Sequence, residues 1–218
     1  MSSSKKQGIF ITLEGPEGAG KTTQLKLLSK FLQDEGVDHV ITRDPGGTSL
    51  GKPIRRILLN AESVVSPVAE LLLYEADRAQ NVSEIILPGL SEGKLVFCDR
   101  YCDSTLAYQG FGRGIELELI RKLNEVASQG LNPQRTILFD IESSAGLARL
   151  HPSGHDRLER EAIEFHQKVR NGYLELAKQD PQRWRILDAA MPMHMVQEEL
   201  RRLVMEVLRP EATGSRVG

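Results

Sequence analysis

Residues 15–22 read Gly15-Pro16-Glu17-Gly18-Ala19-Gly20-Lys21-Thr22. They match the phosphate-binding pattern G-x-x-x-x-G-K-[ST] at every fixed position. An apolar run, Gly8–Leu13, precedes the stretch, and a segment with helical periodicity, Lys21–Glu35, follows it. In such a strand–loop–helix unit, backbone N–H groups and the positive end of the helix dipole face phosphate oxygens. The stretch therefore predicts a site for a nucleoside triphosphate.

This loop also predicts the individual contacts. The Lys21 ammonium would reach the β- and γ-phosphates, and the Thr22 hydroxyl would ligate Mg²⁺. The expected ATP-binding residues are Gly15, Pro16, Glu17, Gly18, Ala19, Gly20, Lys21, Thr22 and Thr23.

The rest of the chain alternates short apolar runs with longer amphipathic segments. The further runs expected as buried strands are Val37–Thr42, Lys94–Cys98, Thr136–Asp140 and Arg185–Leu187. The further expected helices are Val68–Leu90, Ile115–Ala127, Leu158–Lys178 and Met195–Leu208. Such alternation indicates parallel βαβ crossovers. The predicted fold is therefore α/β, a P-loop NTPase-like three-layer sandwich whose five-stranded parallel sheet is covered by helices on both faces.

Composition narrows the class of protein. The chain has 218 residues, of which 40% are hydrophobic and 27% charged, as in ordinary globular proteins. We expect one domain, residues 8–208, between flexible tails at 1–7 and 209–218. A net charge of -2 and 5% aromatic residues argue against a nucleic-acid partner. No apolar run approaches the ~20 residues of a membrane helix. With two cysteines, Cys98 and Cys102, the sequence predicts a reduced, cytoplasmic protein that has no membrane partner.

Two expected strands end in a carboxylate, Asp99 and Asp140, as a Walker B strand does. The sequence contains no Asn-Lys-x-Asp guanine signature, and neither strand ends in the Asp-Glu pair of many ATP-driven motors. Regulatory GTPases and motors are therefore disfavoured. Arg100 directly follows Asp99, and arginine binds oxyanions bidentately. We expect Arg100 to contact a phosphate.

Four motifs, taken in order, resemble bacterial-type thymidylate kinases. They are Gly15–Thr22 with Thr23, Arg43–Thr48, Asp99-Arg100-Tyr101 with Ser104, and Ala107-Tyr108-Gln109-Gly110. The resemblance runs from about Ile9 to Leu208 and implies that residues 8–208 form a nucleoside monophosphate kinase-like domain. It implies transfer of the γ-phosphate of ATP to dTMP in dTTP biosynthesis, with Mg²⁺ held by Thr22 and Asp99. Asp140 is the less favoured carboxylate, because the Asp-Arg-Tyr motif lies with Asp99. The resemblance also implies a homodimer, for which Val68–Leu90 offers an apolar stripe.

The resemblance further implies a dTMP site. Its residues would be Glu17, Asp44, Arg55, Tyr74, Arg78, Arg100, Thr105, Tyr108 and Gln109. Tyr74 would stack on thymine, and Tyr108 would leave no room for a ribose 2′-hydroxyl. Arg55 and Arg100 would hold the acceptor phosphate, and Arg78 would hydrogen-bond a base carbonyl.

The remaining positions complete this site. Glu17 would approach the deoxyribose 3′-hydroxyl, and Thr105 and Gln109 would meet the thymine edge. Asp44 stands where the family usually has glutamate, so the charge is kept on a side chain shorter by one methylene.

A lid is expected at about residues 146–159. Arg149 and Arg157 match the arginines that flank the family's lid, whereas its usually basic middle here holds His151, Pro152 and His155. The loop 15–22 has no basic residue in its variable positions, so we expect Arg149, with Arg157 as a second candidate, to close over the transferring phosphoryl group. The catalytic candidates are Lys21, Arg100, Arg149 and Arg157.

Two alternatives stay open at this point. The chain would have the same phosphate loop if it phosphorylated dUMP, dCMP or a deoxynucleoside. It would also have this loop as a non-catalytic ATP-binding switch, for which the lid poor in cations is the one supporting feature.

Overall fold

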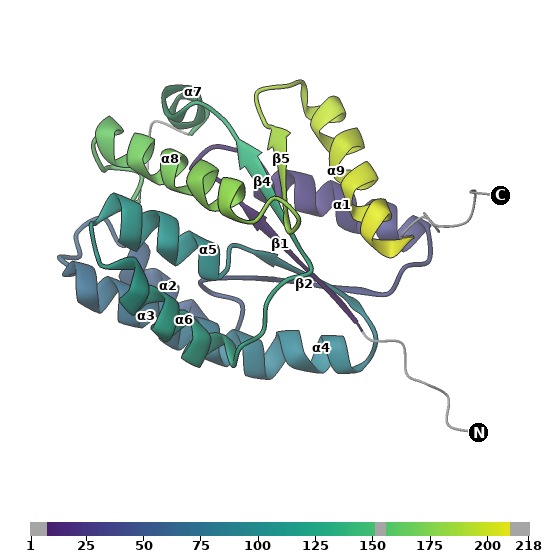
Figure 1. Cartoon of the computed structure of the whole chain (residues 1–218), viewed down its shortest axis with the longest axis horizontal. Helices are drawn as coiled ribbons and strands as arrows, with labels where there is room; N and C mark the ends of the chain where they lie inside the picture. The colour runs from purple at the N-terminus through teal and green to yellow at the C-terminus, as the bar shows by residue number, and fades with distance from the viewer. Residues whose placement is uncertain (1–7, 151–155, 210–218) are drawn as a thin grey trace.

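The computed structural model describes residues 8–150 and 156–209. Five parallel strands form one sheet in the order β2-β3-β1-β4-β5. The strands are β1 Ile9–Glu14, β2 His39–Arg43, β3 Leu95–Asp99, β4 Arg135–Asp140 and β5 Trp184–Asp188. Each overlaps a run expected as a strand, and the predicted five-stranded parallel α/β sheet is confirmed (Figure 1).

Helices connect the strands. The α-helices are α1 Lys21–Asp34, α2 Gly51–Leu59, α3 Pro67–Asn81, α4 Leu87–Ser91, α5 Cys102–Thr105, α6 Leu117–Ser128, α7 Ser143–Ala148, α8 Ile163–Gln179 and α9 Met193–Leu208. Two π-helical segments, η1 Val82–Ile86 and η2 Leu106–Gly112, continue α3 and α5 without a break. The expected helix Val68–Leu90 is thus helical throughout, with a wider turn at η1. None of the helices described is both long and apolar enough to cross a bilayer.

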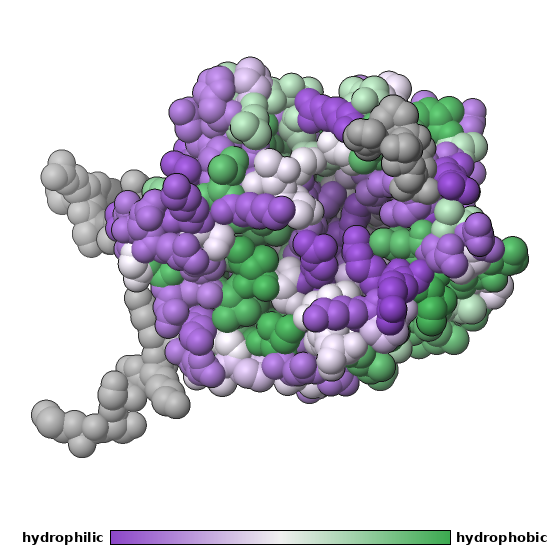
Figure 2. Space-filling model, turned by 180° about the vertical axis from the view of Figure 1, so that it is seen from behind, coloured by the Kyte–Doolittle hydropathy of each residue, from purple (hydrophilic) through white to green (hydrophobic). Residues whose placement is uncertain are grey.

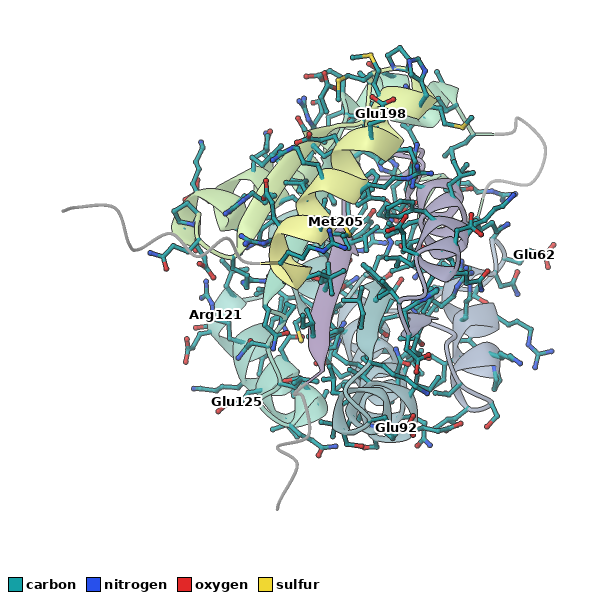
Figure 3. The ribbon with its side chains drawn as sticks, turned by 90° about the vertical axis from the view of Figure 1, so that its right-hand side faces the viewer. Glu62, Glu92, Arg121, Glu125, Glu198 and Met205 are labelled. Carbon is teal, nitrogen blue, oxygen red and sulfur yellow. The ribbon has the colours of Figure 1, made fainter. Side chains whose placement is uncertain are left out.

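Side chains that alternate along the strands build a core on each face of the sheet. On one face, Ile11 and Leu13 of β1 pack with Leu28 of α1 and Leu200 of α9. On the other face, Phe10 packs with residues of η1 and α4, and Leu138 of β4 packs with α3, α6 and α8. Figure 3 shows α9, marked by Glu198 and Met205, beside α1. The helix α6, marked by Arg121 and Glu125, belongs to the core on the other face of the sheet.

Register brings the strand ends together. Asp99 lies opposite Leu13 on one side and Arg43 on the other, and Asp140 lies opposite Asp188. Because the strands are parallel, all their carboxyl ends meet at one edge of the sheet. The loops that follow β1, β2 and β3 therefore converge there, as expected for ligand sites in such folds.

The structure also differs from the predicted elements. The expected helix Leu158–Lys178 begins only at Ile163, so its first residues were predicted wrongly. The Asp156 carboxylate accepts hydrogen bonds from the backbone N–H groups of Leu158 and Glu159, both at 2.9 Å, and this local turn competes with the helix. The predicted tails lie outside the described residues except for Arg209, and so do His151, Pro152 and His155 of the predicted lid.

Candidate active site

The loop of residues 15–22 joins β1 to α1 through two glycines with positive φ. Gly20, at φ 83°, precedes the first residue of α1. Gly18, at φ 70°, lies against α7 so closely that a Cβ there would be 1.9 Å from the Gly146 carbonyl oxygen. Only glycine fits this approach without strain. The loop is therefore held between the sheet and the backbone of α7, with its N–H groups at the start of α1.

Lys21 lies at the centre of this loop. Its Nζ donates to the carbonyl oxygens of Gly15 (2.8 Å) and Pro16 (3.1 Å). Burial, together with the positive charge of Arg100, lowers the pKa of Lys21 to about 8. The ammonium is thus buried among neutral carbonyls, where an anionic ligand would stabilise its charge.

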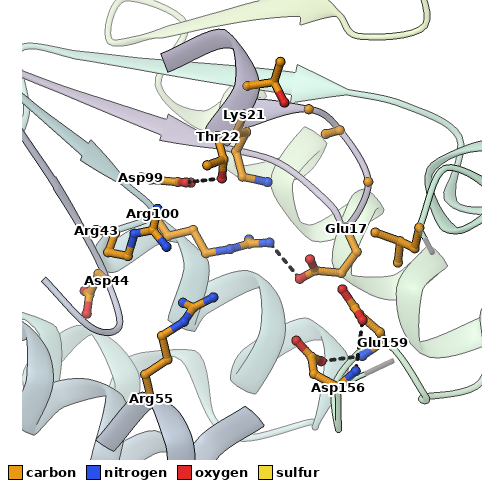
Figure 4. Close-up of a pocket in the computed structure, with 15 residues that line it drawn as sticks. Glu17, Lys21, Thr22, Arg43, Asp44, Arg55, Asp99, Arg100, Asp156 and Glu159 are labelled. Atoms are coloured by element: carbon orange, nitrogen blue, oxygen red, sulfur yellow. Dashed lines mark hydrogen bonds and ion pairs between the residues drawn. The ribbon is translucent and has the colours of Figure 1, made fainter. Parts of the chain in front are cut away.

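The expected metal ligands meet across the sheet edge. Thr22 Oγ1 donates to Asp99 Oδ2 at 3.0 Å (Figure 4). Asp140 is instead held bidentately by Arg170, with Nε–Oδ1 at 2.7 Å and Nη2–Oδ2 at 3.0 Å. A hydroxyl and a carboxylate fit Mg²⁺, which binds few protein oxygens and takes its other ligands from phosphates and water. Between the two strand-end carboxylates, Asp99 is the one free of an arginine partner among the contacts described.

A cleft of ≈ 290 Å³ opens over the loop. Figure 4 shows Arg43, Arg55 and Arg100 reaching into it from one side, opposite Asp156 and Glu159. Burial and the charges of Arg43 and Arg100 lower the pKa of Arg55. The face seen in Figure 2 is hollowed, and hydrophilic residues gather in the hollow. The lining holds four cationic side chains and five carboxylates, so the feature that suits a polyphosphate is the grouping of Arg43, Arg55 and Arg100 near Lys21 and not a net positive charge.

A second, smaller cavity adjoins this cleft. It measures ≈ 20 Å³, about the room of one water molecule. Its lining residues are Glu17, Tyr74, Arg100, Ser104, Thr105, Tyr108, Gln109 and Leu158. Glu17 and Arg100 line both spaces and form an ion pair, Nη2–Oε1 2.7 Å, and Tyr108 donates to the same Glu17 oxygen at 2.7 Å. Burial opposes ionisation of Glu17, but Arg100 and Lys21 outweigh it and lower its pKa.

Glu14, the last residue of β1, connects this strand to the segment that follows β3. Its carboxylate accepts from Tyr101 N (2.8 Å), Ser104 Oγ (2.6 Å) and Tyr173 OH (3.1 Å). Burial, reinforced by the negative charge of Asp103, raises the pKa of Glu14 to about 7. The network links β1, α5 and α8 directly beneath Arg100, whose Nη1 donates to the Tyr173 hydroxyl at 3.2 Å.

Arg78 and Asp44 pair with each other below the cleft. Arg78 Nε donates to Asp44 Oδ2 at 2.8 Å, and its Nη1 donates to Glu75 (2.7 Å) and Asn124 (2.6 Å). Asp44 lines the phosphate cleft, whereas Arg78 is buried and is not among the residues that line the small cavity. The predicted contact between Arg78 and a base carbonyl therefore stays a prediction. In this structure Arg78 reaches the cavity wall through Thr105, at 3.4 Å.

The two lid arginines point to different places. Arg149 Nη1 donates to the Ala189 carbonyl oxygen at 2.8 Å and lines a third cleft, ≈ 370 Å³, beside Gly18 and Thr23. Arg157 donates through Nε to Leu58 O at 2.9 Å and pairs with the buried Glu70 at 2.5 Å. The structure therefore separates two residues that the sequence places at the ends of one lid.

Most of the predicted site residues come together at the sheet edge, apart from Arg78 and Arg157. Sequence reasoning assigned no role to several residues that line or support the clefts, namely Arg43, Glu70, Ser104, Leu150, Asp156, Leu158, Glu159, Tyr173, Met191 and Met193. Arg43 and Ser104 stand in the quoted motifs, which were a signal for them. Leu150, Asp156, Leu158 and Glu159 fall within the expected lid at 146–159, whereas Glu70, Tyr173, Met191 and Met193 approach the site only through the fold.

Comparison with known proteins places this geometry in a family. The family model described as Thymidylate kinase matches residues 13–200. The thymidylate kinase of Carboxydothermus hydrogenoformans is 52% identical over 183 residues, which is 84% of this chain and 89% of that protein. The thymidylate kinase of Symbiobacterium thermophilum is 46% identical over 201 residues, covering 92% and 94%.

A solved structure agrees with these sequence matches. The crystal structure of thymidylate kinase from Ehrlichia chaffeensis superposes with a TM-score of 0.76 at 34% identity, covering 91% of this chain and 99% of that one. The resemblance expected from the four motifs is thus confirmed over nearly the whole chain. This chain belongs to the thymidylate kinase family.

Proposed function

We propose that this protein transfers the γ-phosphoryl group of ATP to dTMP, forming dTDP and ADP for dTTP biosynthesis. The observation that carries the proposal is the pair Glu17 and Arg100, which lines both the arginine-bearing cleft over the phosphate loop and the aromatic-walled cavity beside it. A donor triphosphate in the first space and a nucleoside monophosphate in the second would meet at Arg100. Family membership and the relatives' activity support this arrangement.

The donor side follows from the clefts around the loop. The triphosphate would lie along Gly18–Thr22, with Lys21 at the β- and γ-phosphates. The third cleft shares Gly18, Gly20 and Thr23 with the first and is flanked by Arg149 and Met191. This mixed cationic and apolar lining suits the adenosine end of ATP. We therefore assign Arg149 to the donor nucleotide.

The acceptor side follows from the small cavity. The dTMP phosphate would lie at Arg55 and Arg100, and thymine would lie between Tyr74 and the edge formed by Thr105 and Gln109. The cavity is smaller than a pyrimidine ring, so binding must widen it. Glu17 contacts Arg100 and Tyr108 in this structure. The phosphate and sugar of dTMP would replace these contacts, and the Glu17 carboxylate would then accept from the 3′-hydroxyl.

The reaction needs charge neutralisation more than proton transfer. The attacking group is a phosphate oxygen, largely ionised at pH 7 because its second pKa is about 6. No general base is required. Arg100, Arg55 and Lys21 would hold acceptor and donor in line and offset the repulsion between their charges. Leu150, Asp156 and Glu159 line the cleft on the side of the expected lid. Exclusion of water by this side of the cleft would prevent simple hydrolysis of ATP.

Thr22 and Asp99 are the residues that would hold Mg²⁺. Bound there, the cation would supply charge neutralisation between the β- and γ-phosphates. The Thr22 hydroxyl comes from the first turn of α1 and the Asp99 carboxylate from the end of β3, so the pairing of β1 with β3 and the loop between β1 and α1 set their separation.

The proposed assembly is a cytoplasmic homodimer without nucleic-acid or membrane partners. Two helices in contact, α3 and α6, carry exposed apolar side chains: Val68 and Leu72 on α3 and Leu119 and Val126 on α6, between 45% and 77% exposed. A second copy of the chain would bury them. Light scattering should show a dimer for the native chain and a monomer for Leu72→Glu, with Leu27→Glu on α1 still dimeric. A native monomer would remove the proposal.

The activity is tested by ADP release from Mg-ATP with each nucleoside monophosphate in turn. Rapid release with dTMP, slower release with dUMP and none with dCMP or AMP supports the proposal. ATP binding without release for any monophosphate would instead identify a switch, and a preference for dCMP would identify a different kinase.

A further inference from the structure

Glu70 is a buried carboxylate outside the expected site. It lies on α3 one helical turn before Tyr74 and is fully buried. Its Oε1 accepts from Gln109 Nε2 at 2.8 Å and from Arg113 Nε at 3.2 Å. Its Oε2 accepts from Arg113 Nη2 at 3.2 Å and pairs with Arg157 Nη2 at 2.5 Å. One carboxylate thus joins the cavity edge to two arginines.

Glu70 is ionised in this setting. Burial alone would raise its pKa, but hydrogen bonds from Arg113 and Gln109 outweigh that effect, and the pKa lies below its ordinary value. An ionised carboxylate accepts hydrogen bonds and cannot donate them. It therefore determines which end of the Gln109 amide faces it, and that end is the NH₂ group.

This orientation has a consequence for the cavity. Gln109 lines the cavity together with Tyr74, Thr105 and Tyr108. Because its nitrogen faces Glu70, its carbonyl oxygen, on the other branch of the amide, is the acceptor that the Gln109 side chain offers, and the nitrogen keeps one further N–H on the Glu70 side of the amide. Thymine and uracil carry an N–H donor at ring position 3, whereas cytosine has an acceptor there. An acceptor on the cavity wall therefore favours the first two bases over the third.

We propose that Glu70 is a positioning residue for base selection, which fixes the Gln109 amide so that the cavity accepts a pyrimidine with N3–H and rejects cytosine. The inference rests on the proposed function, since it assigns the base of the acceptor to this cavity. It adds a residue that touches no substrate and acts through Gln109. Arg113 and Arg157 contribute to this role, because their contacts keep the Glu70 carboxylate ionised and fix its position.

The variant Glu70→Gln provides a directional test. Arg157 Nη2, at 2.5 Å, and Arg113 Nη2 face the Oε2 position, whereas the arginine donor at the Oε1 position is Arg113 Nε, at 3.2 Å. The shorter and more numerous arginine contacts at Oε2 therefore favour the oxygen of the introduced amide there. The NH₂ group of that amide then faces Gln109 and turns the Gln109 side chain over, which presents a donor to the cavity. We expect kcat/KM for dTMP to fall about tenfold and kcat/KM for dCMP to rise about tenfold, with KM for ATP changed less than about twofold.

Two further variants separate this role from a general effect on folding. Gln109→Leu leaves Glu70 with both arginines, and it should also lower the ratio of dTMP to dCMP use. In the Gln109→Leu background, Glu70→Gln should change that ratio no further, because the two residues act as one unit. Glu161→Gln is the matched control: Glu161 pairs with Arg113 at 2.7 Å without contacting Glu70, and the ratio should stay at the native value.

For each variant, binding of dTMP and dCMP is measured by calorimetry, and their phosphorylation is measured by turnover. An unchanged ratio in folded Glu70→Gln overturns the inference, as does equal loss for both nucleotides. An unchanged ratio in Gln109→Leu overturns it even if Glu70→Gln does not fold. Failure of the proposed function is a distinct result, read on the native protein as no dTMP-dependent ADP release.

Discussion

The guanidinium of Arg100 and the carboxylate of Glu17 lie 2.7 Å apart at the junction of the phosphate cleft and the small cavity. Arg100 adopts φ 72°, a conformation rare for residues other than glycine, and its backbone N–H donates to Leu13 O at 2.9 Å. The strained backbone directs the side chain over the loop after β1. Any anion that binds Arg100 must compete with Glu17.

The variant Arg100→Lys should weaken binding of the acceptor phosphate more than binding of the donor nucleotide. Lysine keeps the charge but not the planar pair of N–H donors that grips both Glu17 and a phosphate. We expect kcat/KM for dTMP to fall about 100-fold and the Kd for ATP to change less than about threefold. Steady-state kinetics and ATP titration without dTMP measure the two effects. Equal losses on both sides would contradict a specific acceptor role.

The lowered pKa of Lys21 makes ATP binding depend on pH. The protonated ammonium is the form that binds phosphate, and its pKa in the free protein is about 8. ATP affinity should therefore be full below pH 8 and weaken as pH rises through that value, approaching about tenfold per pH unit. Calorimetric titration across this range measures the slope. Lys21→Arg, which stays charged, should bind with a flat profile, and a sloping profile in that variant would assign the titration to another group.

Asp99 and Asp140, the carboxylates at the ends of β3 and β4, provide a matched test of the metal site. Asp99→Asn should raise the Mg²⁺ concentration for half-maximal rate about tenfold, because a charged ligand becomes neutral. Asp140→Asn should leave it near the native value, since Arg170 already occupies that carboxylate. Rates measured over a Mg²⁺ series compare the two. A shift in Asp140→Asn alone would move the metal site to β4.

Glu14 should make stability depend on pH with a definite sign. Its pKa is about 7 in the folded chain, against an ordinary value of 4.5, so between these values the folded state binds a proton that the unfolded state lacks. This contribution to stability is present below pH 4.5 and is lost as pH rises through 7. Melting temperatures of the native chain and Glu14→Gln should therefore differ in favour of the variant increasingly as pH rises. Glu199→Gln should show the opposite sign, because the hydrogen bond from Arg202 lowers the pKa of the partly exposed Glu199. A constant difference for Glu14→Gln would contradict the assignment.

Arg149 is expected to act on the donor nucleotide. Arg149→Ala removes the cation that lines the third cleft and should raise the Kd for ATP about tenfold. Arg202→Ala, an exposed arginine on α9, serves as the control. Fluorescence titration with a labelled ATP analogue reports binding separately from turnover. An unchanged Kd with a loss of kcat above tenfold would instead place Arg149 at the transferring phosphoryl group.

Several features of the fold could be predicted from local sequence. The loop of residues 15–22 is specified by its own glycines, lysine and threonine, and the buried strands by uninterrupted apolar runs such as Leu95–Cys98. The helix α2 was not predicted, because Gly51 and Pro53 in its first turn resemble turn residues. Proline is tolerated there since first-turn N–H groups need no partner within the helix. The helical segment Cys102–Gly112 was missed as well, and its start is stabilised by Glu14, which accepts from Tyr101 N.

Local sequence was enough to specify which groups follow each strand, because side-chain type and strand polarity are local properties. Which of these groups meet depends on how the helices pack against the sheet. Tyr173 reaches Glu14 across 159 positions of chain, Arg170 neutralises Asp140, and Glu70 holds both Gln109 and Arg157. These pairings depend on the packing of α8 and α3 against the sheet, since hydrogen bonds and ion pairs form only within a few ångströms. No local pattern encodes such distances, and they control the charge and orientation of the site.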